Sequence, residues 1–245
     1  MSGQIRRVET AEGGVTGKVF RPSGAVTTGV ILYMDAFGPR PSLAAMAERM
    51  AGWGHVVLLP DLFWRFGAYG PFDARTAFET PETATQLRGM MGATSQDMTV
   101  QDGAVFLDML AAEGVSGAVA TVGYCMGGAR ALNAAAAYPD RIKAAASFHG
   151  GNLASDAADS PHLRVGSIRG RVYVGCAGVD RSFPPEQSAR LAQALREAGL
   201  DHVIENYVGM AHGWCVADHA VYDAVGAERH WRRLEGLLVE SLRAG

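Results

Sequence analysis

Short, uniformly apolar runs alternate with longer segments of helical composition along most of the chain. Runs of this kind predict strands that are buried on both faces of a sheet. We predict strands at residues 29–34, 55–60, 119–122, 142–148, 171–176 and 202–207, and helices at 42–50, 95–110, 185–198 and 220–242. The alternation of the two predicts an α/β fold with a mainly parallel central sheet and helices on both faces.

Two segments depart from this alternation. Residues 4–20 alternate apolar and polar positions with glycine interruptions, which predicts edge strands or a hairpin. Residues 64–94 are rich in glycine, proline and aromatic side chains, and two interpretations stay open for them: a lid or binding loop, or an ordered surface crossing. Because no repeat, linker or low-complexity tract divides the chain, we expect a single domain over residues 5–243.

The composition of the chain argues against nucleic acids and membranes as partners. The chain has 245 residues, of which 48% are hydrophobic, so it is long enough for one large core. A net charge of −3 without a long basic run argues against a nucleic-acid partner. No apolar run approaches the roughly 18 residues of a membrane span, and the amino-terminal residues lack the apolar stretch of a signal peptide.

Cysteine usage points to a reducing compartment. Cys125, Cys176 and Cys215 make an odd number, and their spacing is not that of metal ligands. We therefore expect no disulfide framework, no metal site and a cytoplasmic location.

Residues 119–128 hold the clearest chemical motif. The sequence Gly-Tyr-Cys-Met-Gly at 123–127 fits G-x-S-x-G with Cys125 in place of the serine, after a predicted strand and before an alanine-rich helix. That context is the one required by a nucleophile elbow, a sharp strand-to-helix turn that exposes its central side chain. A structural glycine-rich turn around a buried cysteine is the alternative.

Several reactive side chains follow predicted strands. In open α/β sheets, sites form beyond the carboxyl ends of the strands. This chain places there Asp35, Asp61, Cys125, His149, Asp180 and His212. The order Cys125, Asp180, His212 matches the nucleophile–acid–histidine order of α/β-hydrolases.

With these residues in place, the chain resembles the dienelactone hydrolase (carboxymethylenebutenolidase-like) family of α/β-hydrolases. The matching segments are residues 34–38, 60–63, 123–128, 178–180, 184–186 and 211–214. The resemblance implies an α/β-hydrolase fold, a Cys-His-Asp catalytic triad, no cofactor, and hydrolysis of an ester or lactone.

The implied roles have a chemical basis. Cys125, as a thiolate, would attack a carbonyl carbon and form a thioester. His212 would accept the thiol proton and later activate water, while Asp180 would fix the tautomer of His212. The backbone N–H groups of Ala36 and Met126 would form the oxyanion hole.

Other positions near the motif have two interpretations each. Asp35 would either modulate the protonation of the nucleophile or cap its own loop. His149 could serve as the base, but that would break the chain order, so lining the pocket is the better expectation. The aromatic candidates could equally belong to the core. Candidate substrate-binding residues are Phe37, Phe63, Arg88, Tyr124, His149 and Trp214.

The resemblance departs from the family at one position that matters for substrate. Dienelactone hydrolases hold a substrate carboxylate with arginines, one of them four residues after the catalytic histidine, where this chain has Val216. We therefore expect a small neutral ester or lactone as substrate, with dienelactone hydrolysis proper or promiscuous phosphotriester hydrolysis as alternatives. A catalytically silent binding protein is the non-enzymatic alternative. A redox enzyme pairing Cys125 with Cys215 is disfavoured because there is no C-x-x-C. We expect a monomer or homodimer.

Overall fold

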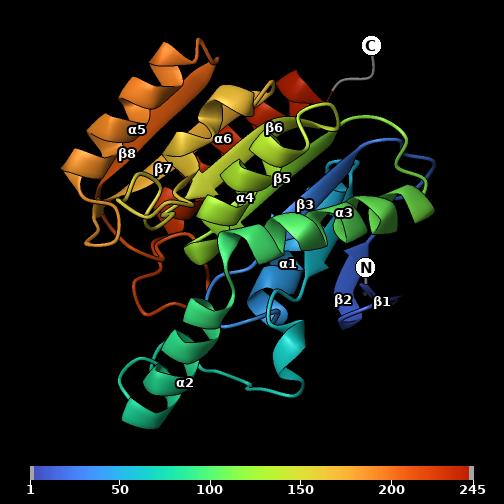
Figure 1. Cartoon of the computed structure of the whole chain (residues 1–245), viewed down its shortest axis with the longest axis horizontal. Coiled ribbons are helices and arrows are strands. Elements are labelled where there is room, and N and C mark those ends of the chain that lie inside the picture. Colours follow the sequence, from blue (N-terminus) through green and yellow to red (C-terminus); the bar gives the residue numbers. More distant parts are fainter. Residues whose placement is uncertain (1–2, 243–245) are drawn as a thin grey trace.

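One eight-stranded sheet forms the centre of the computed structural model, which describes residues 3–242 (Figure 1). The spatial order is β1-β2-β4-β3-β5-β6-β7-β8. The strands are β1 (Gln4–Thr10), β2 (Gly13–Phe20), β3 (Gly29–Tyr33), β4 (Val56–Pro60), β5 (Val119–Tyr124), β6 (Ile142–Phe148), β7 (Arg171–Val179) and β8 (His202–Ala211). β2 pairs antiparallel with both β1 and β4, whereas the neighbouring strands from β4 through β3, β5, β6 and β7 to β8 all pair parallel. The predicted α/β fold with a mainly parallel sheet is confirmed; residue 243, the end of the expected domain, lies outside the described residues.

Helices cover both faces of the sheet. They are α1 (Pro41–Gly52), α2 (Pro81–Ala93), α3 (Gln96–Ala112), α4 (Met126–Ala137), α5 (Pro185–Glu197) and α6 (Ala224–Ser241). Arg49 of α1 forms a two-pronged ion pair with Glu228 of α6, so these helices share one face. Figure 1 shows α3, α4 and α5 in front of the sheet and α6 behind it. Within the described residues, no helix is long and apolar enough to cross a membrane.

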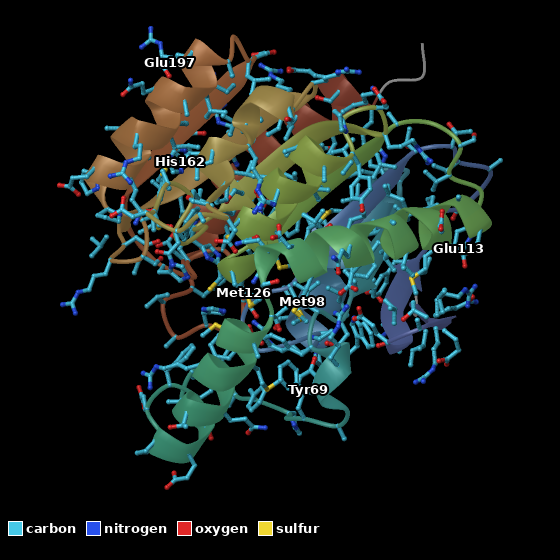
Figure 2. All side chains as sticks on the ribbon, viewed as in Figure 1. Tyr69, Met98, Glu113, Met126, His162 and Glu197 are labelled. Carbon is cyan, nitrogen blue, oxygen red and sulfur yellow. The ribbon has the colours of Figure 1, made fainter. Side chains whose placement is uncertain are left out.

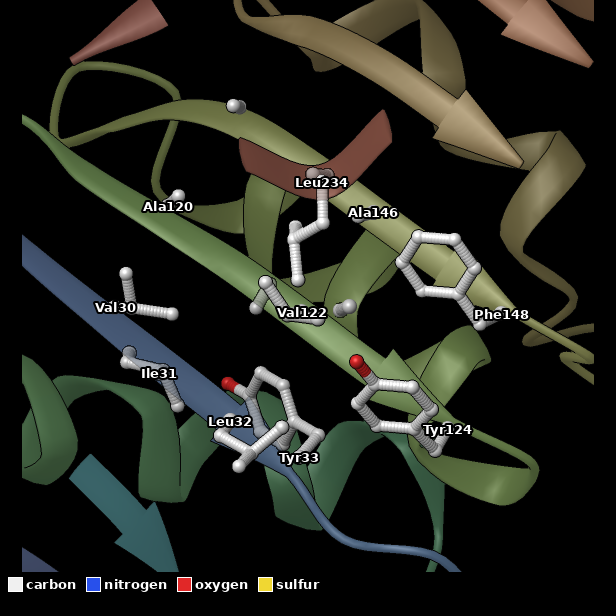
Figure 3. Close-up of a cluster of buried hydrophobic side chains, with 14 of the residues drawn as sticks. Val30, Ile31, Leu32, Tyr33, Ala120, Val122, Tyr124, Ala146, Phe148 and Leu234 are labelled. Carbon is white, nitrogen blue, oxygen red and sulfur yellow. The ribbon is translucent and has the colours of Figure 1, made fainter. Parts of the chain in front are cut away.

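The hydrophobic core lies along the central parallel strands. All five residues of β3 and all six of β5 are buried, because helices pack on both faces of these strands. Figure 3 shows Ile31, Val122 and Phe148 among the side chains that fill this core, with Leu234 of α6 beside them. The uniformly apolar runs in the sequence therefore reflect two-sided burial.

The irregular segment 64–94 contains a helix, α2, that its composition did not predict. α2 begins at Pro81, a residue suited to the first helical position, and projects from the body of the molecule (Figure 1). It buries only Ala84, Leu87 and Met90, which lie one turn apart. Gly89 and Gly92 lower helix propensity, and most other positions are exposed, so the apolar signal was too sparse to predict this helix.

One buried histidine links α6 to the elbow strand. His230 is fully buried, and its Nε2 lies 2.7 Å from the hydroxyl of Tyr124. Its Nδ1 lies 3.1 Å from the carbonyl of Ala227, so the neutral ring donates to that carbonyl and accepts from the tyrosine. Burial lowers the pKa of His230 to about 3.

We predict that His230 makes the protein less stable in mild acid. The unfolded chain binds a proton on this histidine below about pH 6.5, whereas the folded protein does not until about pH 3. Stability should therefore fall as the pH drops from about 6.5 to 3, by about 1.4 kcal/mol per pH unit and by up to about 5 kcal/mol. Urea unfolding between pH 7 and 4 measures this slope. His230→Gln, which cannot titrate, should flatten it; equal slopes in both proteins would contradict the prediction.

Candidate active site

A sharp turn between β5 and α4 presents the thiol of Cys125. The backbone of this residue has φ 55° and ψ −121°, a left-handed conformation that non-glycine residues rarely adopt. A Cβ at Gly123 would lie 1.9 Å from the carbonyl oxygen of Gly127, and a Cβ at Gly127 would lie 2.5 Å from those of Tyr33 and Met34. The flanking glycines are therefore required, because α4 passes too close to β5 at Gly123 and to the end of β3 at Gly127 for a side chain at either position.

The end of β6 holds this turn in place. The backbone N–H of Cys125 donates to the carbonyl of Phe148 at 3.2 Å and faces Nδ1 of His149 at 3.1 Å. His149 itself has φ 39° and is buried. Because Nδ1 of His149 accepts, this ring is neutral, and burial holds its pKa well below the usual range.

An acid and a base meet beyond the ends of β7 and β8. Nδ1 of His212 lies 2.7 Å from Oδ2 of Asp180. The other carboxylate oxygen accepts from the backbone N–H of Ser182 at 2.8 Å and from its hydroxyl at 2.6 Å. The Ser182 hydroxyl is also 3.2 Å from Nδ1 of His212. These contacts orient the imidazole so that its Nε2 is free for another partner.

The charges of the site favour a protonated His212. Burial lowers the pKa of this imidazole, but the neighbouring Cys125 and Asp180 outweigh burial and raise it to about 10. Burial raises the pKa of Asp180, yet its hydrogen bonds from His212 and Ser182 bring the net pKa below the ordinary value. Cys125 lies close enough to His212 to contribute to this raised pKa. The structure thus brings together the three residues of the expected triad.

These residues share one cavity of about 620 Å³, open to solvent. Its wall is formed by residues that follow β3, β5, β6, β7 and β8, together with residues of α2, α3 and α4. Met126, labelled in Figure 2, lies on this wall at the start of α4. Besides the expected Ala36, Cys125, Met126, Asp180 and His212, the lining residues are Phe78, Met91, Gly92, Gln96, Ala129, Arg130, Gly151, Asn152, Arg181 and Ser182. A small organic substrate fits a cavity of this size.

Two backbone N–H groups are available beside the thiol. Ala36 and Met126 both line the cavity. Across residues 3–242, neither backbone N–H donates a hydrogen bond to a side chain or to a loop carbonyl. Met126 is the first residue of α4, so its N–H has no partner within the helix either. The pair is therefore free to bind a developing oxyanion.

Asp35 is fully occupied by other partners. Its carboxylate accepts from the backbone N–H of Phe37 at 3.1 Å, from two nitrogens of Arg40 at 2.6 and 2.8 Å, and lies 3.1 Å from Nε2 of His219. Burial raises the pKa of Asp35, but His219 and Arg40 outweigh burial and lower it. Of its two expected roles, the contacts fit loop capping; among the described residues, no hydrogen bond joins Asp35 to Cys125.

Three aromatic candidates are core residues. Phe63, Tyr124 and Trp214 are all completely buried and are absent from the cavity wall. Tyr124 stacks on Phe148, as the core view in Figure 3 shows, and Trp214 packs against Tyr207. Of the two interpretations left open for these three side chains, their complete burial fits the core.

The remaining candidates lie behind or beside the cavity. Phe37 packs edge-on against Phe78, which does line the cavity, and the guanidinium of Arg88 in α2 lies 5.8 Å from the centre of the Phe78 ring. The centre of the His149 ring lies 4.8 Å from that of the His212 ring. None of the three is on the wall of this cavity.

Sequence reasoning missed several wall residues. Ser182 follows Asp180 by two residues, a spacing that could have indicated a hydroxyl able to bond that carboxylate. Phe78 precedes α2 and Met91 lies in its last turn, and this helix was not predicted. Arg130 is buried and donates to the carbonyl of Thr94, and nothing in its helical context distinguishes it from a surface arginine. Within residues 3–242, no cluster of three or more His, Cys, Asp or Glu side chains could hold a metal ion.

Comparison with known proteins identifies the family to which this chain belongs. The sequence model of the dienelactone hydrolase family matches residues 15–242, nearly the whole chain. The chain belongs to the dienelactone hydrolase family. Membership in this family makes the protein a hydrolase.

Individual relatives are distant but extend over the full domain. A carboxymethylenebutenolidase homologue from Synechocystis sp. is 26% identical over 222 residues, which cover 87% of this chain and 86% of the relative. A dienelactone hydrolase homologue from Klebsiella pneumoniae has a similar structure, with a TM-score of 0.83 at 20% identity, covering 98% of this chain and all of that one. A dienelactone hydrolase-like promiscuous phosphotriesterase from metagenomic libraries gives 0.78 at 24% identity, over 99% of this chain and 100% of the other. The fold is therefore that of the α/β-hydrolases.

Proposed function

We propose that the protein hydrolyses small esters or lactones with Cys125 as nucleophile. The observation that carries the proposal is the placement of Cys125, Asp180 and His212 in one cavity, with Asp180 2.7 Å from the imidazole. Nucleophile, base and orienting acid are the three parts of a hydrolytic triad. EC class 3.1, hydrolysis of ester bonds, is the activity that fits them.

Acylation begins after the thiol of Cys125 has transferred its proton to His212. The raised pKa of that imidazole favours a thiolate–imidazolium pair, and the thiolate is the nucleophile. The sulfur attacks the substrate carbonyl carbon, and the oxygen gains negative charge between the N–H groups of Ala36 and Met126. The C–O bond to the leaving group then breaks, the imidazolium gives its proton to the leaving oxygen, and a thioester on Cys125 remains.

Deacylation follows from the change in charge that acylation produces. The thioester sulfur carries no charge, so one cause of the raised pKa of His212 disappears. The imidazole becomes a better general base for water, which attacks the thioester carbonyl. The acid product leaves, and the proton returns to the Cys125–His212 pair. Asp180 and Ser182 hold the imidazole in one tautomer throughout.

The cavity wall supports neutral, fairly apolar substrates. Phe78, Met91, Met126 and Ala129 contribute apolar side chains to it. Of the two arginines on the wall, Arg181 is exposed, and Arg130 is buried with one nitrogen bonded to a backbone carbonyl; among the described residues its Nε and Nη1 have no partner. We propose a monomer or homodimer that acts on such a small molecule in the cytoplasm, without a cofactor.

Trapping the acyl-enzyme tests this proposal. Wild-type protein mixed with 4-nitrophenyl butyrate and quenched in acid within one turnover should gain the mass of one butyryl group. Peptide mapping should place the group on Cys125, and neutral hydroxylamine should remove it. Cys176 and Cys215, which are buried, serve as internal controls. Hydrolysis without an adduct, or an adduct on another residue, would contradict the proposal.

Phosphotriester hydrolysis is a second candidate. It is supported by the likeness to the promiscuous phosphotriesterase over nearly the whole chain and by the cavity, in which the same N–H pair could bind a phosphoryl oxygen. Paraoxon turnover that disappears in Cys125→Ala would support it. Paraoxon turnover at the background rate of buffer would exclude it.

A further inference from the structure

A buried ionic cluster joins the loop after β3 to the loop after β8. Arg40 forms two hydrogen bonds to Asp35, at 2.6 and 2.8 Å, and two to Asp218, at 2.6 and 2.9 Å. The Arg40 side chain is only 9% exposed and Asp35 is completely buried. A planar guanidinium held by two carboxylates in this way has little freedom to move.

His219 adds a second connection between the same two loops. Its Nε2 lies 3.1 Å from Oδ2 of Asp35. Its ring also packs directly on the backbone next to His212, because a Cβ at Gly213 would lie 2.2 Å from Nδ1 of His219. We call Asp35, Arg40, Asp218 and His219 the Arg40 cluster.

The two loops carry different parts of the proposed reaction. The loop after β3 carries Ala36, the residue next to Asp35, whereas the loop after β8 carries His212. His212 has its own partners, Asp180 and Ser182, at the end of β7. Ala36 is a small side chain in a loop without helix or strand bonds, so its position depends on what holds the loop.

We propose that Arg40 is a positioning residue, which through this cluster fixes the Ala36 N–H where the oxyanion forms. The proposal rests on the proposed function, since it assigns Ala36 to the oxyanion hole. Arg40 does not line the cavity within the described residues, so it acts on the reaction through the loops that it holds. We assign its effect to Ala36, because His212 keeps its own partners Asp180 and Ser182. Displacements of about 1 Å at a reacting centre lower rates by about a hundredfold.

The test separates two reactions of the same thiol. Hydrolysis of 4-nitrophenyl acetate needs the oxyanion hole, whereas alkylation by iodoacetamide forms an S–C bond and expels iodide without making an oxyanion. Arg40→Met should lower kcat/KM for the ester roughly ten- to a hundredfold. The alkylation rate of Cys125 should change less than about threefold, because Asp180 and Ser182 still hold His212.

Two further variants keep the test sharp. Asp218→Ala removes the Arg40–Asp218 link between the loops but leaves the His219–Asp35 contact and the buried Asp35–Arg40 pair intact, so it guards against misfolding of Arg40→Met. It should lower ester hydrolysis in the same direction by a smaller factor. Arg49→Met is the matched control, because it removes an equally two-pronged but exposed pair with Glu228. This control should change neither reaction.

Each outcome has one interpretation. A selective loss of ester hydrolysis in Arg40→Met and Asp218→Ala supports the proposal. Equal losses of hydrolysis and alkylation, or unchanged hydrolysis in folded variants, would overturn it. Wild-type protein that alkylates at Cys125 but hydrolyses no ester would instead refute the proposed function itself.

Discussion

Cys125→Ala is expected to lower kcat/KM for 4-nitrophenyl butyrate by at least about a thousandfold. Removal of a triad nucleophile leaves only the rate enhancement that the oxyanion hole and binding supply. The alanine side chain fits the elbow because the backbone at residue 125 is held by Phe148 and His149 and needs no sulfur. Release of 4-nitrophenolate at pH 7.5 measures the loss, with circular dichroism to show that the variant is folded.

Cys176→Ala is the control for this prediction. Cys176 is buried in β7, outside the cavity that holds Cys125, so its removal should leave hydrolysis within about twofold. Its thiol also has a pKa raised to about 11 by burial, which makes it a poor nucleophile at neutral pH. Wild-type rates in folded Cys125→Ala would refute cysteine catalysis.

Asp180→Asn should cause the second large loss, about a hundred- to ten-thousandfold in kcat/KM. An amide in place of the carboxylate can donate to Nδ1 of His212 and so hold its proton on the wrong nitrogen. It also removes one of the charges that raise the pKa of His212.

The size of the loss of kcat/KM in Asp180→Asn should depend on Ser182. Its hydroxyl oxygen is 3.2 Å from Nδ1 of His212 and can accept a hydrogen bond from the ring N–H when the carboxylate is absent. The double variant Asp180→Asn/Ser182→Ala should therefore lose at least about tenfold more than Asp180→Asn. Asp97→Asn, which changes an exposed partner of Arg164, serves as control. Additive small effects of the two site changes would show that the hydroxyl plays no such part.

The three residues of the proposed triad could be found in the sequence because their context is local. Cys125 stands in a motif, and Asp180 and His212 each follow an apolar strand whose end could be read from the sequence. Parallel strands bring such ends to one edge of the sheet, so convergence follows from the fold. The strands of the sheet were predictable for a similar reason, because strands buried on both faces are visible in the sequence as short, uniformly apolar runs.

What could not be predicted depends on distant contacts. Tyr124 and Trp214 follow or adjoin catalytic positions, but whether a ring fills the core or the cavity depends on the opposing element, here Phe148 and Tyr207. The pairing of Arg40 with Asp218 spans 178 positions and has no local pattern. α2 escaped prediction because two glycines and an exposed surface hide its short apolar stripe.

The elbow and α2 differ in how much sequence change they can accept. No side chain fits at Gly123 or Gly127, so the turn that carries Cys125 and the Met126 N–H accepts no larger residue at either position. α2 packs instead through a small separate cluster around Phe37, Ala77 and Leu87, and its other side chains are largely exposed. Directed evolution toward bulkier esters should therefore accumulate substitutions along α2 and its neighbour Phe78, while the turn that carries the sulfur stays unaltered.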